Sequence, residues 1–296
     1  MKPTYSICIC NYNMANTIET SLISLLTQIN DDFEVIIVDD GSTDNSVTII
    51  KKMQSTFSNI RLISLARDQS RKLGLTRNIS IKEAKGEYVL LHLDCDDVFG
   101  PHIMSFVKIF HRLEKCIQHD ILVSGQHINM ARREFLLGHG PYLNIYRGED
   151  RNLWSRMAKI DAWIPLDHID FITRIPKDKN QRLVKAIGDA FDHLKNDFRS
   201  GLTLRDSLVG LLHRRNSISL KFFVLNLGLL LPSYISSRSA DPIPQDGTLD
   251  TPSAFAAYRE RSRGTYPEIM QRNGCDPSLA FLEDKDARLI FSNKRI

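Results

Sequence analysis

Apolar strands that alternate with helical segments are the feature of this sequence that most constrains its fold. Four apolar runs in the first hundred residues predict strands at residues 5–10, 33–38, 60–65 and 88–93, and the segments between them predict helices at 17–28, 46–54 and 76–84. Strands that are apolar throughout and joined by helices are typical of a parallel sheet covered on both faces. The predicted fold class is therefore α/β, with a mostly parallel sheet flanked by helices.

Polar residues follow three of these predicted strands directly. The three clusters are Asn11-Tyr12-Asn13, Asp39-Asp40 and Asp94-Cys95-Asp96-Asp97. Ligands of such sheets bind beyond the carboxyl ends of the strands. We therefore expect the three clusters to lie along one rim of the sheet.

The acidic cluster at residues 94–97 predicts a site for a divalent cation. Several carboxylates at one strand end repel one another unless a cation neutralises them, and hard oxygen ligands suit Mn²⁺ or Mg²⁺ shared with a diphosphate. A solvated turn or a helix cap is the alternative interpretation. Asp40 has two interpretations as well: its carboxylate can accept hydrogen bonds from a uracil N–H or a ribose hydroxyl, or it can belong to a turn with Gly41-Ser42-Thr43-Asp44.

The order of these motifs resembles glycosyltransferase family 2, the nucleotide-sugar-dependent inverting enzymes with a GT-A fold. The segments that carry the resemblance are SICICNYNMANTIETSLISLLTQ, FEVIIVDDGSTDNS and GLTRNISIKEAKGEYVLLHLDCDD, within residues 4–100. The resemblance implies a GT-A type, Rossmann-like sheet. The turn after the first strand departs from the usual family pattern, and the Gln-x-x-Arg-Trp motif of the processive synthases is missing from the sequence. Addition of a single sugar is therefore favoured.

The same resemblance implies a role for each candidate residue on the rim. Tyr12 would lie beside the nucleotide base and Asp40 would bind it, whereas Arg77 would contact the diphosphate. Asp94 would contact ribose or metal, and Asp96 would ligate the metal. The nucleotide-sugar candidates are Asn11, Tyr12, Asn13, Asp40, Arg77 and Asp94, and the metal candidates are Asp96 and Asp94.

A second acidic pair, Glu149-Asp150, precedes a predicted helix at residues 153–159 and resembles the catalytic acids of the same family. Inverting transfer needs a base that takes the proton of the acceptor hydroxyl while its oxygen attacks the anomeric carbon opposite the departing diphosphate. We expect Asp150 to be this general base, with Glu149 beside it. The alternative is that Asp150 only caps the helix and Glu149 is solvated.

The second half of the chain combines basic and apolar residues. A further strand is predicted from Ile121 to Ile128. Helices are predicted at 178–198 and from Thr203 to about His213, and residues 218–235 are the most apolar stretch. The ten residues Phe222–Leu231 are too few to span a bilayer, but a basic, apolar segment can lie in the membrane interface. We expect peripheral membrane contact through residues 214–235, with a buried hairpin or a subunit interface as alternatives. The basic residues nearby are Arg199, Arg205, Arg214, Arg215, Lys221 and Arg238, against Asp206 as the single acid.

These observations divide the chain into a donor-binding and catalytic core (1–160), a mainly helical acceptor-side or membrane-facing region (161–237), and a linker with a C-terminal tail (238–296). The five cysteines are scattered and contain no CxxC pair, so reduced thiols are expected. The chain opens without the pattern of a secretory signal, and a net charge of +4 is too small to indicate nucleic acid. The expected location is the cytoplasm, at the cytosolic face of the membrane.

The leading hypothesis is a metal-dependent inverting glycosyltransferase. It would move one sugar from a UDP or GDP sugar to a hydroxyl of a glycan or of a lipid-linked acceptor, with Mn²⁺ or Mg²⁺ as cofactor. Two alternatives stay open: a polyprenyl-phosphate glycosyltransferase, and a non-catalytic nucleotide-sugar-binding subunit of a glycan assembly complex. Assembly into a homo-oligomer is open as well.

Overall fold

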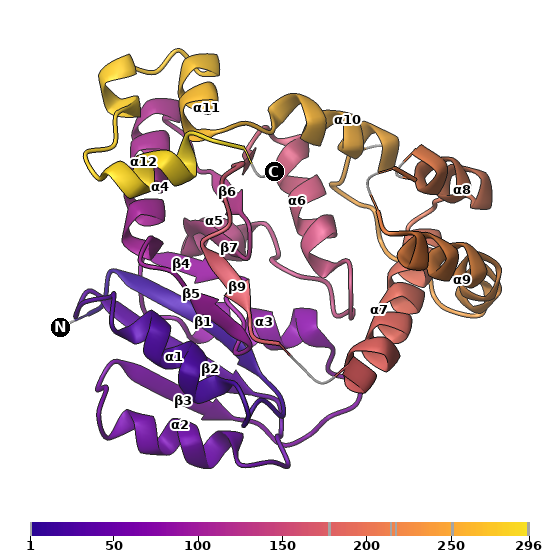
Figure 1. Ribbon diagram of the computed structural model, residues 1–296, viewed down its shortest axis with the longest axis horizontal. Coiled ribbons are helices and arrows are strands. Elements are labelled where there is room, and N and C mark those ends of the chain that lie inside the picture. The colour runs from indigo at the N-terminus through magenta and orange to yellow at the C-terminus, as the bar shows by residue number, and fades with distance from the viewer. Residues whose placement is uncertain (1, 177–178, 214, 217, 250–251, 295–296) are drawn as a thin grey trace.

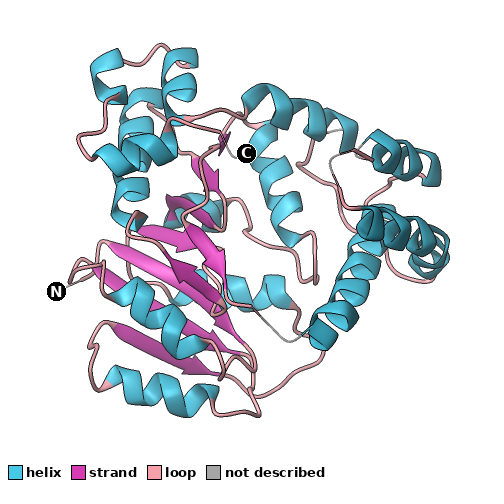
Figure 2. Cartoon of the chain, in the orientation of Figure 1, coloured by secondary structure: helices cyan, strands magenta, loops and turns pink. Residues whose placement is uncertain are grey.

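A computed structural model describes residues 2–176, 179–213, 215–216, 218–249 and 252–294. Within them, seven strands form a central sheet in the order β3-β2-β1-β4-β7-β6-β8. Helices lie on both faces of this sheet (Figure 2). Neighbouring strands pair in parallel except β4 with β7 and β6 with β7. The mostly parallel α/β sheet is thus confirmed. The strands are β1 (Tyr5–Asn11), β2 (Phe33–Asp39), β3 (Ile60–Ser64), β4 (Tyr88–Leu91), β6 (Leu122–Gly125), β7 (Ile128–Arg132) and β8 (Trp163–Pro165).

Both faces of the sheet are buried, because successive side chains of a strand point to opposite sides. Ile7 and Ile9 of β1 belong to one apolar cluster, whereas Cys8 between them belongs to the other. The first cluster includes residues of α1 (Ile18–Leu26), α2 (Ser46–Gln54) and α4 (Ile103–Ile117). The second includes residues of α3 (Leu73–Glu83), α5 (Arg133–Gly138) and α6 (Glu149–Lys159). These two layers explain why the predicted strands carry no polar face.

The single strand predicted from Ile121 to Ile128 is wrong. The structure has an antiparallel hairpin there, in which β6 and β7 are joined by Gln126 and His127. His127 has φ 57°, a left-handed conformation that glycine or asparagine usually supplies at such turns. The sequence therefore did not indicate a turn at this position.

A small second sheet carries one of the sequence's acids toward the rim. Strand β5 (Asp97–Phe99) pairs antiparallel with β9 (Ile172–Arg174), and Asp97 lies opposite Arg174. This pairing joins two segments that are far apart in the sequence. It brings an arginine from the second half of the chain to the acidic cluster of the first half.

Helices α7 (Lys179–Arg199), α8 (Leu204–His213) and α9 (Leu220–Arg238) form a group beside the sheet (Figure 1). The predicted helix start at Asp178 lies outside the described residues. Thr203 caps α8 as expected, because its Oγ accepts a hydrogen bond from the backbone N–H of Asp206 at 3.1 Å. Helix α9 is longer than the ten apolar residues considered above, and by length and composition alone it is able to cross a membrane.

The C-terminal region is helical and packs onto the core. It contains α10 (Pro252–Ser262), α11 (Tyr266–Arg272), the 3₁₀ turn η1 (Pro277–Ala280) and α12 (Lys285–Phe291). Tyr266 and Phe291 are fully buried in the same apolar cluster as Phe106 of α4. The segment expected to be a tail is therefore part of the folded unit, at least where the structure describes it.

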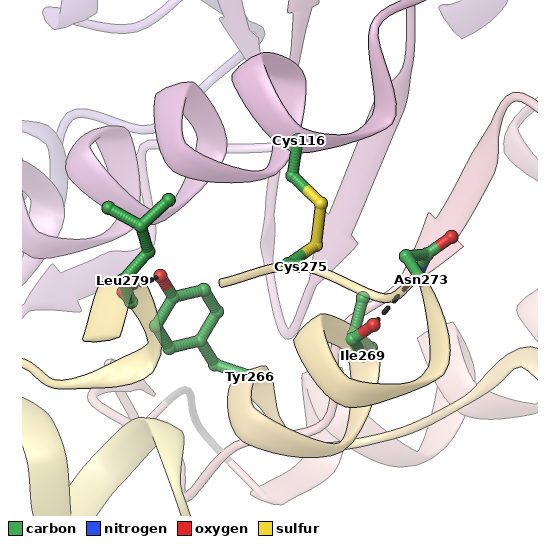
Figure 3. Close-up of a disulfide and its surroundings, with 6 residues drawn as sticks. All are labelled: Cys116, Tyr266, Ile269, Asn273, Cys275 and Leu279. Atoms are coloured by element: carbon green, nitrogen blue, oxygen red, sulfur yellow. Dashed lines mark hydrogen bonds between the residues drawn. A yellow bond between two sulfur atoms is a disulfide. The ribbon is translucent and has the colours of Figure 1, made fainter. Parts of the chain in front are cut away.

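A disulfide joins this C-terminal region to α4, and the expectation of reduced cysteines is wrong for this pair. Cys116 near the end of α4 is bonded to Cys275 after α11, and their Cα atoms are 5.6 Å apart (Figure 3). The two cysteines are 159 residues apart in sequence, so only the packing of α11 against α4 brings them together. Cys8, Cys10 and Cys95 are free.

Candidate functional site

One cavity of about 410 Å³ lies at the rim where the polar clusters meet. It collects residues from the ends of β1, β2 and β4, from α3, and from the second half of the chain. Six of the candidate residues line it together, as the rim argument expects; Asn13, Glu149 and Asp150 do not. The lining residues are Cys10, Asn11, Tyr12, Met14, Asp40, Arg67, Leu73, Thr76, Arg77, Asp94, Cys95, Asp96, Tyr146, Arg147, Arg174 and Lys185.

The two asparagines of the first cluster hold the turn that follows β1. Asn11 is buried, and its Nδ2 donates to Asp39 Oδ1 at 2.6 Å. Asn13 has φ 52°, and its Oδ1 accepts from the backbone N–H of Thr43 at 2.8 Å. These bonds tie the ends of β1 and β2 to each other. In this structure both side chains therefore fix the backbone of the rim.

Tyr12 and Asp40 are both engaged by arginines. The Tyr12 ring is 42% exposed, and the guanidinium of Arg67 lies 4.5 Å from its centroid. Asp40 pairs through one carboxylate oxygen with Arg67 and through the other with Arg71, whose Nε lies at 2.5 Å. An exposed ring backed by a cation is a suitable stacking surface for a nucleotide base. Asp40 holds the arginine that lies over this ring.

Arg77 of α3 is a buried cation between Glu149 and Tyr142. Its Nη2 lies 3.6 Å from Glu149 Oε1, and its guanidinium lies 5.5 Å from the centre of the Tyr142 ring. Its Nη1 is buried and has no hydrogen-bond partner among the residues that the structure describes. An unpartnered buried donor is costly unless a ligand satisfies it. Arg77 is thus suited to bind an anion in the cavity.

Glu149 is nearly fully buried, at 3% exposure, and within the described part of the chain its Oε2 also lacks a hydrogen-bond partner. Burial raises the pKa of the Glu149 carboxyl; the charge of Arg77 opposes this rise and that of Asp150 adds to it. Through this ion pair, Glu149 links α6 to the cavity residue Arg77.

Asp150 occupies the first turn of α6, where the N-cap residue is Gly148. The alternative in which Asp150 is the N-cap is therefore wrong. The side chain is half-buried, and its Oδ1 accepts from the backbone N–H of Arg151 at 2.7 Å. Gly148 and Arg151 line a second cavity of about 230 Å³ between α6, α7 and α10. In the sequence, Asp150 thus directly follows Glu149, which contacts Arg77, and directly precedes Arg151, which lines the second cavity.

The acids after β4 form a cluster that fits a hard cation. Asp94, Asp96 and Asp97 each offer a carboxylate oxygen, and these oxygens lie within 4.8 Å of one another. Asp96 and Asp97 are buried, which makes their mutual repulsion strong. Oxygen donors of this kind and spacing suit Mn²⁺ or Mg²⁺. The donor set therefore agrees with the predicted metal site.

Arg174 reaches the same acids from β9. Its Nε lies 3.0 Å from Asp97 Oδ1, and its Nη2 lies 2.9 Å from Asp94 Oδ2 and 3.7 Å from Asp96 Oδ1. Burial lowers the pKa of Arg174, but the hydrogen bond to Asp97 and the charges of the other acids outweigh it and raise that pKa. Arg174 therefore remains charged.

The charges that line the larger cavity favour an anionic ligand. Five cationic side chains and three carboxylates face it. Sequence reasoning missed four of the cations, because no motif surrounds them and only the fold brings them to the rim. They are Arg67, Arg147, Arg174 and Lys185.

Among solved structures, the mannosyltransferase PcManGT from Pyrobaculum calidifontis, in complex with GDP-Man and Mn²⁺, has a similar fold. The TM-score is 0.53 at 18% identity, over 95% of this chain and 86% of that chain. At this identity the likeness concerns the fold alone.

Two curated relatives are similar in sequence over the first part of the chain. The UDP-Glc:alpha-D-GlcNAc-diphosphoundecaprenol beta-1,3-glucosyltransferase WfaP of Escherichia coli is 32% identical over 128 residues, which are 40% of this chain and 49% of the relative. The cholesterol galactosyltransferase of Borreliella burgdorferi is 29% identical over 136 residues, 44% of this chain and 36% of the relative. The matched region thus spans less than half of the length of either relative.

A family model described as glycosyl transferase family 2 matches residues 6–157, slightly more than half of the chain. The matched region begins in β1 and ends in α6, so it contains the three strand ends of the rim and the pair Glu149-Asp150. On this match, the chain belongs to glycosyl transferase family 2.

Proposed function

We propose that this protein is a metal-dependent inverting glycosyltransferase that moves one sugar from a nucleoside diphosphate sugar to a hydroxyl of a glycan or lipid-linked acceptor. The observation that carries the proposal is the cavity in which Tyr12, Arg77 and the acids Asp94 and Asp96 face one space. In this cavity Tyr12 can stack on a base, Arg77 can bind a diphosphate, and the two acids can hold a divalent cation. The ligands bound in the structure of the mannosyltransferase PcManGT, GDP-Man and Mn²⁺, support this interpretation.

In this proposal the donor lies along the rim. The base stacks on Tyr12, and UDP and GDP sugars both remain candidates. The diphosphate contacts Arg77, whose buried Nη1 supplies an unpaired donor. Asp94 and Asp96 would hold Mn²⁺ or Mg²⁺. The metal would offset the negative charge that develops on the departing diphosphate.

Asp150 is proposed as the general base, with Glu149 as the residue that ties α6 to Arg77. The position of Asp150 next to Glu149, and between residues of the second cavity, supports an acceptor that approaches from the α6 side. The acceptor hydroxyl gives its proton to the Asp150 carboxylate while its oxygen attacks the anomeric carbon. A base of this kind typically contributes about 10²- to 10⁴-fold in rate.

The test is the Asp150→Asn variant. We expect transfer of radiolabelled sugar to an extracted glycolipid fraction to fall at least about 100-fold, because the amide cannot take the proton. Calorimetric titration with UDP-glucose, UDP-galactose and GDP-mannose should give unchanged donor affinity. Glu134→Gln, an exposed acid on α5, is the control and should retain activity.

Unchanged turnover of Asp150→Asn with the hydroxyl acceptors would exclude Asp150 as the base. Full activity of the variant with a polyprenyl phosphate would instead favour the polyprenyl-phosphate glycosyltransferase, since that acceptor is already ionised at neutral pH. Failure of wild-type protein to bind any nucleotide sugar would contradict the proposed donor site.

The surface of α8 and α9 supports the proposal that the protein acts at a membrane. Large apolar residues are exposed on α9 at positions 220, 222, 224, 227, 231 and 235, and all of them except 222 are at helical spacing, which places them on one face. Leu230, Ser233 and Ser237 are buried on another side of the helix, where Leu230 packs with Phe198 of α7. Basic side chains flank the exposed face at Arg215 and Lys221; Arg214, also considered above, lies outside the described residues.

A further inference from the structure

Arg174 is fixed in the acidic cluster by a buried partner. Its Nε donates to Asp97 Oδ1 at 3.0 Å, and Asp97 is fully buried. The pairing of β9 with β5 places the two residues opposite each other, so the backbone as well as the side chains holds this contact. His127 contacts the same carboxylate: its Nδ1 lies 3.6 Å from Asp97 Oδ2. Asp97 therefore acts as the anchor of the guanidinium.

The other end of the guanidinium points to the two acids of the proposed metal site. Nη2 of Arg174 lies 2.9 Å from Asp94 Oδ2 and 3.7 Å from Asp96 Oδ1. A divalent cation held by Asp94 and Asp96 needs oxygen atoms of the same two carboxylates. It would also be repelled by the charge of the guanidinium at short range.

We propose that Arg174 is an internal competitor of the divalent cation. It holds Asp94 and Asp96 together without metal, and it lowers the affinity of the two acids for Mn²⁺. This inference rests on the metal site of the proposed function, and it assigns to Arg174 a positioning role that sets how tightly the site binds metal. The residue itself takes no part in the transfer of the proton or of the sugar.

The experiment is a titration of the nucleotide-free protein with Mn²⁺, in which free Mn²⁺ is measured by electron paramagnetic resonance. We expect Arg174→Gln to bind Mn²⁺ at least about tenfold more tightly than wild type, because the competing charge is gone. The matched control is Arg147→Gln. Arg147 lines the same cavity but pairs with Asp189 and not with the acidic cluster, so its loss should change Mn²⁺ affinity by less than about threefold.

A second pair of variants guards against misfolding, because Arg174→Gln leaves Asp97 buried without its main partner. In the double variant R174Q/D97N the buried charge is removed together with the guanidinium. Its Mn²⁺ affinity is compared with that of D97N, and the same increase is expected. Circular dichroism and thermal melts confirm that each variant is folded.

Equal or weaker Mn²⁺ binding in both comparisons, with clear binding by wild type, would overturn the role of Arg174 and leave the proposed metal site intact. Absence of Mn²⁺ binding in wild type and in every variant would overturn the metal site and this inference together. Binding that appears only when Arg174 is replaced would support the inference in its strongest form.

Discussion

Two buried glutamates differ in how completely their oxygens are satisfied. Glu34 of β2 accepts hydrogen bonds from Ser6 Oγ at 2.5 Å, from the backbone N–H of Lys85 at 2.6 Å and from Arg61 Nε at 3.2 Å. Glu149 makes a 3.6 Å ion pair with Arg77, and its Oε2 has no hydrogen-bond partner among the described residues. A satisfied buried charge stabilises the fold, whereas an unsatisfied one costs stability and is common at functional sites.

The first prediction concerns Glu34. Burial raises its pKa, but the hydrogen bonds from Ser6, Lys85 and Arg61 outweigh burial and lower the pKa below its usual 4.5. The stabilising effect of the carboxylate is therefore present above pH 4.5 and is lost as the pH falls through the lower pKa of the folded state. Glu34→Gln should lower the free energy of unfolding at pH 7 by about 2–3 kcal/mol, and the difference from wild type should shrink below pH 4.

Urea unfolding at pH 7 and at pH 3.5 measures this difference. The matched control is Glu83→Gln, because Glu83 also pairs with Arg61, at 3.7 Å, but is 53% exposed. Its loss should cost less than about 1 kcal/mol at either pH. A difference between wild type and Glu34→Gln that stays the same at both pH values would contradict the argument.

At the scale of elements, the sequence predicts most of the sheet and less of what surrounds it. β1, β2 and β4 begin at the predicted residues, because strands buried on both faces must be apolar throughout. The hairpin of β6 and β7 was missed because its turn uses His127 instead of glycine or asparagine. Short strands such as β9 have no periodicity to detect at all.

The rim was predictable because each polar cluster follows its strand directly in sequence. The residues that complete the cavity, such as Arg174 and Lys185, come from β9 and α7, and their positions depend on long-range packing. The same reason accounts for the disulfide. Cys116 and Cys275 meet only because α11 packs on α4, and the spacing of cysteines in a sequence contains no such information.

The disulfide leads to a prediction for the C-terminal helices. A cross-link between residues this far apart restricts the unfolded chain, so its loss should lower the free energy of unfolding by about 2–4 kcal/mol. We expect the midpoint of guanidinium unfolding of wild type to fall when dithiothreitol is added. The C116A/C275A variant should have the same low midpoint with and without dithiothreitol, close to that of reduced wild type.

The double variant is its own control, because dithiothreitol has no cross-link to break in it. Cys95→Ala provides a second control, since Cys95 is buried and free; the variant should remain sensitive to the reductant. A wild-type midpoint that does not respond to dithiothreitol would show that the cross-link contributes nothing to stability.

At the scale of the whole molecule, α7 lies between the rim of the sheet and the apolar surface of α9. Lys185 of α7 lines the larger cavity, and the same helix packs along α9 (Figure 1). Net charge alone does not reveal this arrangement, since +4 spread over 296 residues is unremarkable. What matters is that charged residues of both signs gather at the rim, while basic and apolar residues gather on α8, on α9 and between them. A lipid-linked acceptor held at a bilayer would thus be close to the helix that borders the donor cavity.

The last prediction tests this surface. The variant V224D/L231D places two charges on the exposed apolar face of α9, away from the buried residues Leu230, Ser233 and Ser237. Each inserted apolar side chain contributes about 1.5–3 kcal/mol when it leaves water, so co-sedimentation with phosphatidylglycerol vesicles should weaken at least about tenfold. Wild type should bind these vesicles more tightly than phosphatidylcholine vesicles, because basic residues flank the face. Leu289→Asp on α12 is matched in exposure, 59% against 57% for Leu231, and should bind as wild type does. Equal binding by V224D/L231D and wild type would exclude α9 as the membrane-facing surface, and the lipid-linked acceptor would then have to approach from another side.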